Sequence, residues 1–278
     1  MKLASTKPEV AAARDLIAGE TPGEHFAVRT SEDQAAEIVH AIFPIVMWRQ
    51  TEPVVAVGTG FFVGMNGLFV TAKHVIEAAL NNDGKLSSQL GILQLMSENK
   101  FYLREIVLAA SHPVADVAIG YAIPMKHKIT GAPMPNKTLT LASEAPALGS
   151  DVFTYAYPRT KVIGSGPGTE GIECTPGYFV GKLSEAHPNG RDRVLLPGPC
   201  FRTSMVIHGG ASGGPVMTVD GRVFAVNSTG VSDDTVSYVT CVSSAFDLPI
   251  PGVVLPDSSA PRSSTLREFN EHGLVLIR

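Results

Sequence analysis

The chain has 278 residues, of which 44% are hydrophobic and 17% charged, and its formal net charge is −4. This composition is typical of a globular protein with enough apolar material for a buried core, arranged as one large domain or two ordinary ones. The acidic balance, without any dense Lys/Arg run, argues against nucleic acid as the main partner.

The cysteines and the N-terminal segment indicate the compartment. Cys174, Cys200 and Cys241 form an odd and sparse set, so we expect reduced thiols and not a disulfide framework. Residues 1–30 are interrupted by charges, and no uncharged apolar stretch in the sequence is long enough to span a bilayer. We therefore expect a cytoplasmic protein with no membrane partner. Export without a leader, or after removal of one, stays an alternative.

The first half of the chain changes from helical to strand-like patterns. Pro8 and Gly19 bound a weak helix signal, and Ser31 with Gln34 has the spacing of a capping box for a second helix. Short runs rich in β-branched and aromatic residues then predict six strands, at 43–49, 55–64, 67–72, 90–96, 102–109 and 116–122. Residues 123–137, with three prolines and little periodicity, indicate a linker.

The second half is also rich in predicted strands. These lie at 138–142, 151–157, 177–184, 193–197, 201–207, 215–219, 222–228 and 236–243. Asp220-Gly221 marks a hairpin, and the Gly/Pro-rich residues 158–176 are longer than an ordinary connection. Thr265 and Glu268 could cap a short helix that Gly273 ends. The pattern predicts two β-rich halves, each a barrel or a sandwich.

Three short segments carry candidate chemistry. They are "TAKH" with His74, "DVAI" opened by Asp116, and "GASGGP" with Ser212. Each alone has an ordinary structural explanation, as a histidine at a strand end, an aspartate that caps a strand, and a glycine-rich turn. Glycines around one serine also allow unusual backbone angles and a close approach by another molecule.

In this order, the three segments resemble those of a trypsin-like serine peptidase of the chymotrypsin fold, closest to the bacterial HtrA-type branch. The likeness extends to "EIVHAIFPIVMW", "ALGSDVFTYAYP" and "VDGRVFAVNSTG". It implies an all-β fold of two six-stranded antiparallel barrels with short helical extensions. The implied domains are an N-terminal extension (1–34), a first barrel (35–137), a second barrel (138–249) and a C-terminal tail with a short helix (250–278).

The resemblance also implies roles for individual residues in a serine endopeptidase. His74 would be the general base, Asp116 would orient it, and Ser212 would be the nucleophile. The backbone amides of Gly210 and Ser212 would form the oxyanion hole.

The implied substrate contacts lie on both sides of the nucleophile in the sequence. Asn227, Ser228, Thr229 and Gly230 would pair with an extended peptide. Val206, six residues before the nucleophile, would favour a small or medium apolar residue at the cleaved position, because a basic side chain would be left unpaired there. The expected partner is a protein or peptide substrate. No metal-ligand spacing or dinucleotide motif is present, so neither a metal nor another cofactor is expected.

The sequence departs from the HtrA-type pattern in two ways and leaves other functions open. No segment is long enough for the PDZ domain that follows in such proteins, and no export signal is visible. A domain that binds peptides without cleaving them stays an alternative, as does activation by a regulatory partner or by homo-oligomerisation. "GASGG" also fits the nucleophile elbow of an α/β-hydrolase esterase, which would need Asp247 and His272 as its acid and base.

Overall fold

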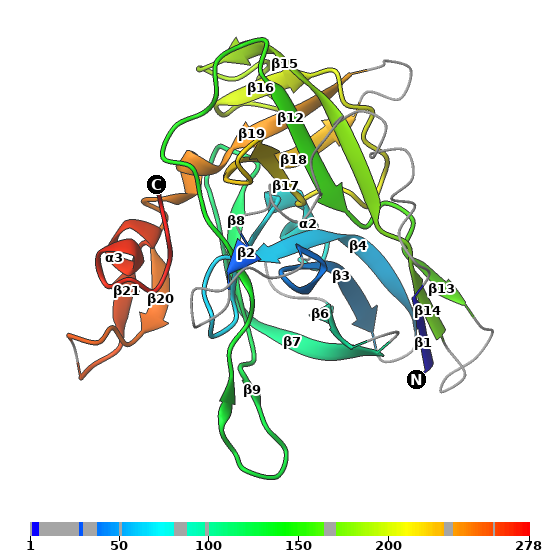
Figure 1. The fold of residues 1–278 in the computed structure, drawn as a ribbon, viewed down its shortest axis with the longest axis vertical. Coiled ribbons are helices and arrows are strands. Elements are labelled where there is room, and N and C mark those ends of the chain that lie inside the picture. The colour runs from blue at the N-terminus through cyan, green and yellow to red at the C-terminus, as the bar shows by residue number, and fades with distance from the viewer. Residues whose placement is uncertain are drawn as a thin grey trace.

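The computed structural model contains two closed β-barrels that lie one above the other in Figure 1. It describes residues 2–5, 28–29, 38–49, 52–80, 88–97, 100–163, 171–230, 236–257 and 259–278. Each barrel is formed by six antiparallel strands, which confirms the predicted double barrel. The helix expected at 8–19 and the capping box of Ser31 and Gln34 lie outside the described residues, and residues 38–40 form a short 3-10 helix, η1 (Ile38–His40).

The first barrel closes in the order β3-β4-β5-β8-β7-β6. Its strands are β3 (Ile42–Arg49), β4 (Glu52–Phe62), β5 (Leu68–Thr71), β6 (Gln89–Ser97), β7 (Lys100–Ser111) and β8 (Ala118–Ala122). The short helix α2 (Lys73–Glu77) follows β5 directly. All six strands overlap the ranges predicted from the sequence, because short runs of β-branched and aromatic residues, bounded by turn residues, mark them.

The second barrel closes in the order β12-β15-β16-β19-β18-β17. Its strands are β12 (Asp151–Ala156), β15 (Gly177–His187), β16 (Cys200–Thr203), β17 (Pro215–Thr218), β18 (Val223–Gly230) and β19 (Ser237–Cys241), and the 3-10 helix η2 (Val242–Ala245) follows. The predicted hairpin at Asp220-Gly221 is confirmed between β17 and β18, where Gly221 has a φ of 79°.

One predicted strand of the second half is wrong. Residues 193–197 form turns because the Asp192 carboxylate accepts the amides of Val194 and Leu195 at 2.8 and 2.7 Å. These contacts satisfy the amides locally and remove them from any strand ladder. The apolar run Val194-Leu195 is exposed and does not face a core.

Small elements surround the barrels. They are β1 (Lys2–Ser5), β2 (Val28–Arg29), β9 (Met125–Lys126), β10 (Pro133–Met134), β11 (Thr138–Leu139), β13 (Lys161–Ile163), β14 (Gly171–Cys174), β20 (Ile250–Val253), β21 (Arg262–Ser264) and α3 (Leu266–Glu271). The predicted linker 123–137 thus carries the hairpin β9–β10, and β1 pairs in parallel with β14. The capping box of Thr265 and Glu268 is confirmed at the start of α3.

The C-terminal tail packs beside the first barrel, where β20, β21 and α3 are drawn in orange and red in Figure 1. Its last residues lie along the connection between the barrels, since the Arg278 amide donates to the Leu141 carbonyl at 2.9 Å. None of the helices in the described ranges is long and apolar enough to cross a membrane.

Aromatic rings fill the first barrel. Phe43 contacts Phe62 and Phe69, with ring centroids 4.5 and 5.5 Å apart. Phe69 lies opposite Gly120 in the ladder between β5 and β8, and a Cβ added at Gly120 would lie 2.1 Å from the Phe69 ring. The glycine therefore makes room for the ring.

We expect Gly120→Ala to lower the free energy of unfolding by about 1–3 kcal/mol, because the added methyl overlaps a fully buried ring that has no space to move. Chemical denaturation measures this change. Ala109 pairs with Gly120 from β7 and is exposed, so Ala109→Ser is the matched control and should change stability by less than about 0.5 kcal/mol. Equal stability of the two variants would contradict this description of the core.

Candidate active site

The three candidate segments meet where the two barrels face each other. His74 lies in α2, immediately after β5 of the first barrel, and Asp116 lies in the loop that leads into β8. Ser212 lies in the second barrel, in the loop between β16 and β17, which we call the nucleophile loop (residues 208–214). The Ser212 carbonyl accepts the amide of Thr59 in β4 at 2.8 Å, which joins this loop to the first barrel.

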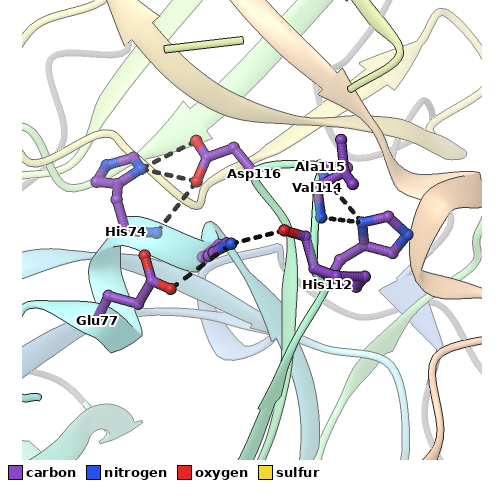
Figure 2. A network of polar contacts seen from close by, with 8 residues as sticks. His74, Glu77, His112, Val114, Ala115 and Asp116 are labelled. Carbon is purple, nitrogen blue, oxygen red and sulfur yellow. Dashed lines mark hydrogen bonds and ion pairs between the residues drawn. The ribbon is translucent and has the colours of Figure 1, made fainter. Parts of the chain in front are cut away.

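The His74 ring and the Asp116 carboxylate form a close pair (Figure 2). The His74 Nδ1 atom lies 2.9 Å from Asp116 Oδ2 and 3.0 Å from Oδ1, and the His74 backbone amide donates to Oδ1 at 3.1 Å. Burial alone would raise the pKa of Asp116, but the hydrogen bonds and charge of His74, with a hydrogen bond from Ser228, hold that pKa below its ordinary value. The ionised carboxylate therefore keeps the His74 proton on Nδ1 and leaves Nε2 as an acceptor.

Ser212 rests beside this pair without bonding to it. Its hydroxyl donates to the Ser228 carbonyl at 3.4 Å, and no hydrogen bond joins it to the His74 ring within the described part of the chain. Catalytic hydrogen bonds are often long or unformed in a ligand-free site and tighten when substrate binds. Ser228 therefore contacts both the serine hydroxyl and, through its own hydroxyl, Asp116.

The nucleophile loop turns sharply at Gly209 and Gly210. The Ala211 amide donates to the His208 carbonyl at 3.1 Å, and Gly210 has a φ of 90°, which defines a type II turn. Among the contacts of the described residues, the amides of His208, Gly209, Gly210 and Ser212 donate to no protein group, and those of Gly210 and Ser212 lie two residues apart in the turn. Two such free N–H groups on one loop are suited to stabilise a developing oxyanion.

The loop packs tightly on the first barrel through Gly213. Its φ is 86°, and a Cβ there would lie 2.1 Å from Thr71 Oγ1 and 2.2 Å from the Thr59 carbonyl oxygen. Only glycine fits both the backbone angle and the space.

Contacts that the sequence did not reveal hold the loop that carries Asp116. His112 Nδ1 accepts the amides of Val114 and Ala115 at 3.1 and 2.7 Å (Figure 2). Lys73 Nζ donates to the Pro113 carbonyl at 3.2 Å and lies 3.7 Å from Glu77 Oε1. Burial, and then the positive charge of Lys73, lower the pKa of His112. In the sequence, His112 is only a polar residue two and three positions before the residues whose amides it accepts. Such a spacing is typical of many turns.

The predicted substrate-binding residues fall into two groups. Asn227 is buried, its Nδ2 donates to Thr154 Oγ1 at 2.8 Å and to the Ala211 carbonyl at 3.3 Å, and its backbone bonds to Gly213 and Gly214. Its polar groups thus support the nucleophile loop. The other four predicted residues lie in two segments. Ser228, Thr229 and Gly230 continue β18, whereas Val206 is 45% exposed and lies in the irregular stretch after β16.

His112 gives the site a pH-dependent component of stability. Burial, and then the positive charge of Lys73, hold the pKa of His112 below the ordinary 6.5, and Nδ1 of the ring accepts the two amides only when it carries no proton. A lowered pKa means that the unfolded chain binds the proton first as the pH falls. This contribution to stability is therefore present above about pH 6.5 and is lost as the pH falls through the folded pKa.

We expect His112→Asn, which keeps an acceptor that does not titrate, to lose less stability than the wild type between pH 7.5 and 5. His112→Ala should be less stable by about 1 kcal/mol at pH 7.5, because two amides lose their acceptor. Urea unfolding at several pH values measures both effects. Parallel pH profiles of the wild type and His112→Asn would show that His112 does not act in this way.

The sequence matches one known protein family. The family described as "Trypsin-like peptidase domain" matches residues 58–226, a span that contains His74, Asp116 and Ser212. No curated protein matches the chain.

Among solved structures, the crystal structure of Deg5 matches with a TM-score of 0.53 and 18% identity over 73% of this chain and 84% of that chain. The active form of the Rv3671c protease from M. tuberculosis matches with a TM-score of 0.52 and 17% identity over 88% of this chain and 87% of that chain. At such low identity these likenesses show a shared fold, whereas the family match covers more than half of the sequence. The chain belongs to the trypsin-like peptidase family.

Proposed function

We propose that the protein is a serine endopeptidase that hydrolyses peptide bonds through an acyl-enzyme intermediate. The observation that carries this proposal is the Asp116–His74 pair, which lies beside a serine loop whose Gly210 and Ser212 amides donate to no described group. Membership of the trypsin-like peptidase family supports a peptidase and a protein or peptide substrate. The roles of the individual residues are part of the proposal.

Each residue has one task in the proposed reaction. His74 Nε2 takes the proton from Ser212 Oγ as that oxygen attacks the peptide carbonyl, and Asp116 stabilises the imidazolium that results. The amides of Gly210 and Ser212 bind the oxyanion. The intermediate collapses as His74 protonates the leaving amine, which leaves the acyl group on Ser212. A water then attacks the ester, with His74 again as the base.

The substrate is expected to lie as an extended strand beside Ser228–Gly230, added to the end of β18. The backbone of Asn227 is already bonded to the nucleophile loop, so pairing would begin after it. Val206 would contact the side chain at the cleaved position and favour an apolar residue there.

The α/β-hydrolase alternative does not fit the structure. In that fold the serine lies between a strand and a helix, whereas Ser212 leads into the strand β17. The acid and base that it would need are also bonded to other groups: Asp247 binds Arg267 at 2.8 Å, and His272 Nε2 lies 3.6 Å from Asp257. A domain that binds peptides without cleaving them remains the competing function that experiment must exclude.

The proposed mechanism predicts a different loss of activity for each residue of the triad. With casein or a quenched peptide library as substrate, Ser212→Ala and His74→Ala should each lower kcat by on the order of 10⁶. Asp116→Asn should lower it by about 10⁴, because the amide favours the wrong tautomer of His74. Circular dichroism should show all three variants folded. A folded wild type that cleaves no substrate, or a Ser212→Ala variant that still cleaves, would refute the proposed function.

The proposed position of Val206 predicts the cleavage specificity. The wild type should cleave after small or medium apolar residues, and Val206→Asp should shift the preference toward Lys and Arg, because the new carboxylate would pair with a basic side chain. Mass spectrometry of cleaved peptide libraries reads out both preferences. Val219, also an exposed valine but beyond β17, supplies the control: Val219→Asp should leave the preference unchanged. A wild type that prefers Lys or Arg would contradict the role of Val206.

A further inference from the structure

Thr59 lies at the contact between the barrels, in β4 of the first barrel, and is fully buried. It follows Gly58, whose added Cβ would lie 2.8 Å from the Ser212 carbonyl oxygen, so the strand passes directly against the nucleophile loop. A buried polar side chain is retained only when its hydrogen bonds are satisfied, so the partners of Thr59 indicate its task.

The Thr59 hydroxyl bonds to two backbone groups of the second barrel. It donates to the Gly210 carbonyl at 2.8 Å and accepts the amide of Tyr157 at 3.0 Å. A hydroxyl has one donor, so the bond to Gly210 uses it fully. Tyr157 itself lies next to the loop, because a Cβ added at Gly210 would lie 3.1 Å from the Tyr157 carbonyl oxygen.

The backbone of Thr59 completes the attachment. Its amide donates to the Ser212 carbonyl at 2.8 Å, and its own carbonyl accepts the Thr71 hydroxyl at 2.7 Å. Gly210 and Ser212, whose amides are the proposed oxyanion donors, are thus each held through their carbonyl by the same residue. Thr71 ends β5, just before His74, and so connects Thr59 to the strand that positions the base.

This attachment matters because four of the seven residues in the loop are glycines. Gly209, Gly210, Gly213 and Gly214 allow many backbone angles, and an oxyanion donor acts only within about 2.7–3.1 Å of the developing charge. We propose that Thr59 is a positioning residue. Its hydroxyl holds the Gly210 carbonyl, and with it the Gly210–Ala211 peptide unit, so that the adjoining Gly210 amide keeps its oxyanion-binding orientation. The inference rests on the proposed function for its catalytic consequence, while the attachment itself is independent of it.

Three variants test the proposal. Thr59→Val keeps the shape and the backbone bonds but removes the hydroxyl, whereas Thr59→Ser keeps it. Thr203 is a fully buried threonine of β16 whose hydroxyl bonds to the Ser237 carbonyl at 3.4 Å, so Thr203→Val controls for the loss of a buried hydroxyl. If Thr59→Val does not fold, Thr59→Cys, of similar size and with a weak donor, replaces it.

The kinetic readout is the separate change in kcat and KM for a peptide substrate. Thr59→Val should lower kcat about 10- to 100-fold with little change in KM, as expected for a small displacement of a transition-state contact. Its affinity for a peptide boronate, which mimics the tetrahedral intermediate, should fall by a similar factor. Thr59→Ser should restore kcat to within about 3-fold of the wild type. Equal kcat in Thr59→Val and the wild type, or an equal loss in Thr203→Val, would overturn the proposal.

A second readout does not need activity. Amide hydrogen exchange of the peptide covering residues 208–214 should be faster in Thr59→Val than in the wild type, Thr59→Ser and Thr203→Val. Unchanged exchange in Thr59→Val would overturn the proposal even if the enzyme were active. An inactive wild type with faster exchange in Thr59→Val would support the attachment and refute only the proposed peptidase function.

Discussion

The hydrogen bonds between β4 and the nucleophile loop hold the two barrels in the relative position on which the site depends. His74 and Asp116 belong to the first barrel and Ser212 to the second, so no local structure can bring them together. The Thr59 amide bonds to the Ser212 carbonyl at 2.8 Å, and Gly58 and Gly213 have no side chains that would separate the two surfaces. A larger side chain at either glycine should therefore change the distance between His74 and Ser212 without altering either residue.

The ionisation state of Asp116, in the first barrel, also depends on the packing around it. Burial would favour a neutral Asp116, yet the bonds from His74 and Ser228 lower its pKa, so the carboxylate stays charged beside the ring. The loop that carries it is held by His112 and by Lys73, which also lies in α2 next to His74. Asp116, His74 and their supports thus form one connected unit, while the second barrel contributes Ser212 and the amides of Gly210 and Ser212.

Much of the fold could be predicted from the sequence, because local residue patterns determine most of its strands and turns. Short runs of β-branched and aromatic residues predicted the barrel strands, Asp220-Gly221 predicted a hairpin, and Thr265 with Glu268 predicted a helix start. The strand expected at 193–197 failed because Asp192 captures the amides, which an apolar run does not reveal. The support by Thr59 depends on a contact 151 residues away along the chain, and His112 acts as an acceptor only in its folded loop, so neither leaves a local signal. The three motif residues were found because their order resembles that of a known family.

Labelling by a serine-reactive fluorophosphonate, read by intact mass and peptide mapping, tests most directly whether the two barrels together activate one serine. We expect a single adduct on Ser212 in the wild type and at least a 100-fold slower reaction in His74→Ala, since an unassisted hydroxyl is a poor nucleophile. Labelling of Ser212 that survives the loss of His74 would contradict activation across the barrel contact. A wild type that does not react would contradict a preformed peptidase site and favour a fold retained for binding.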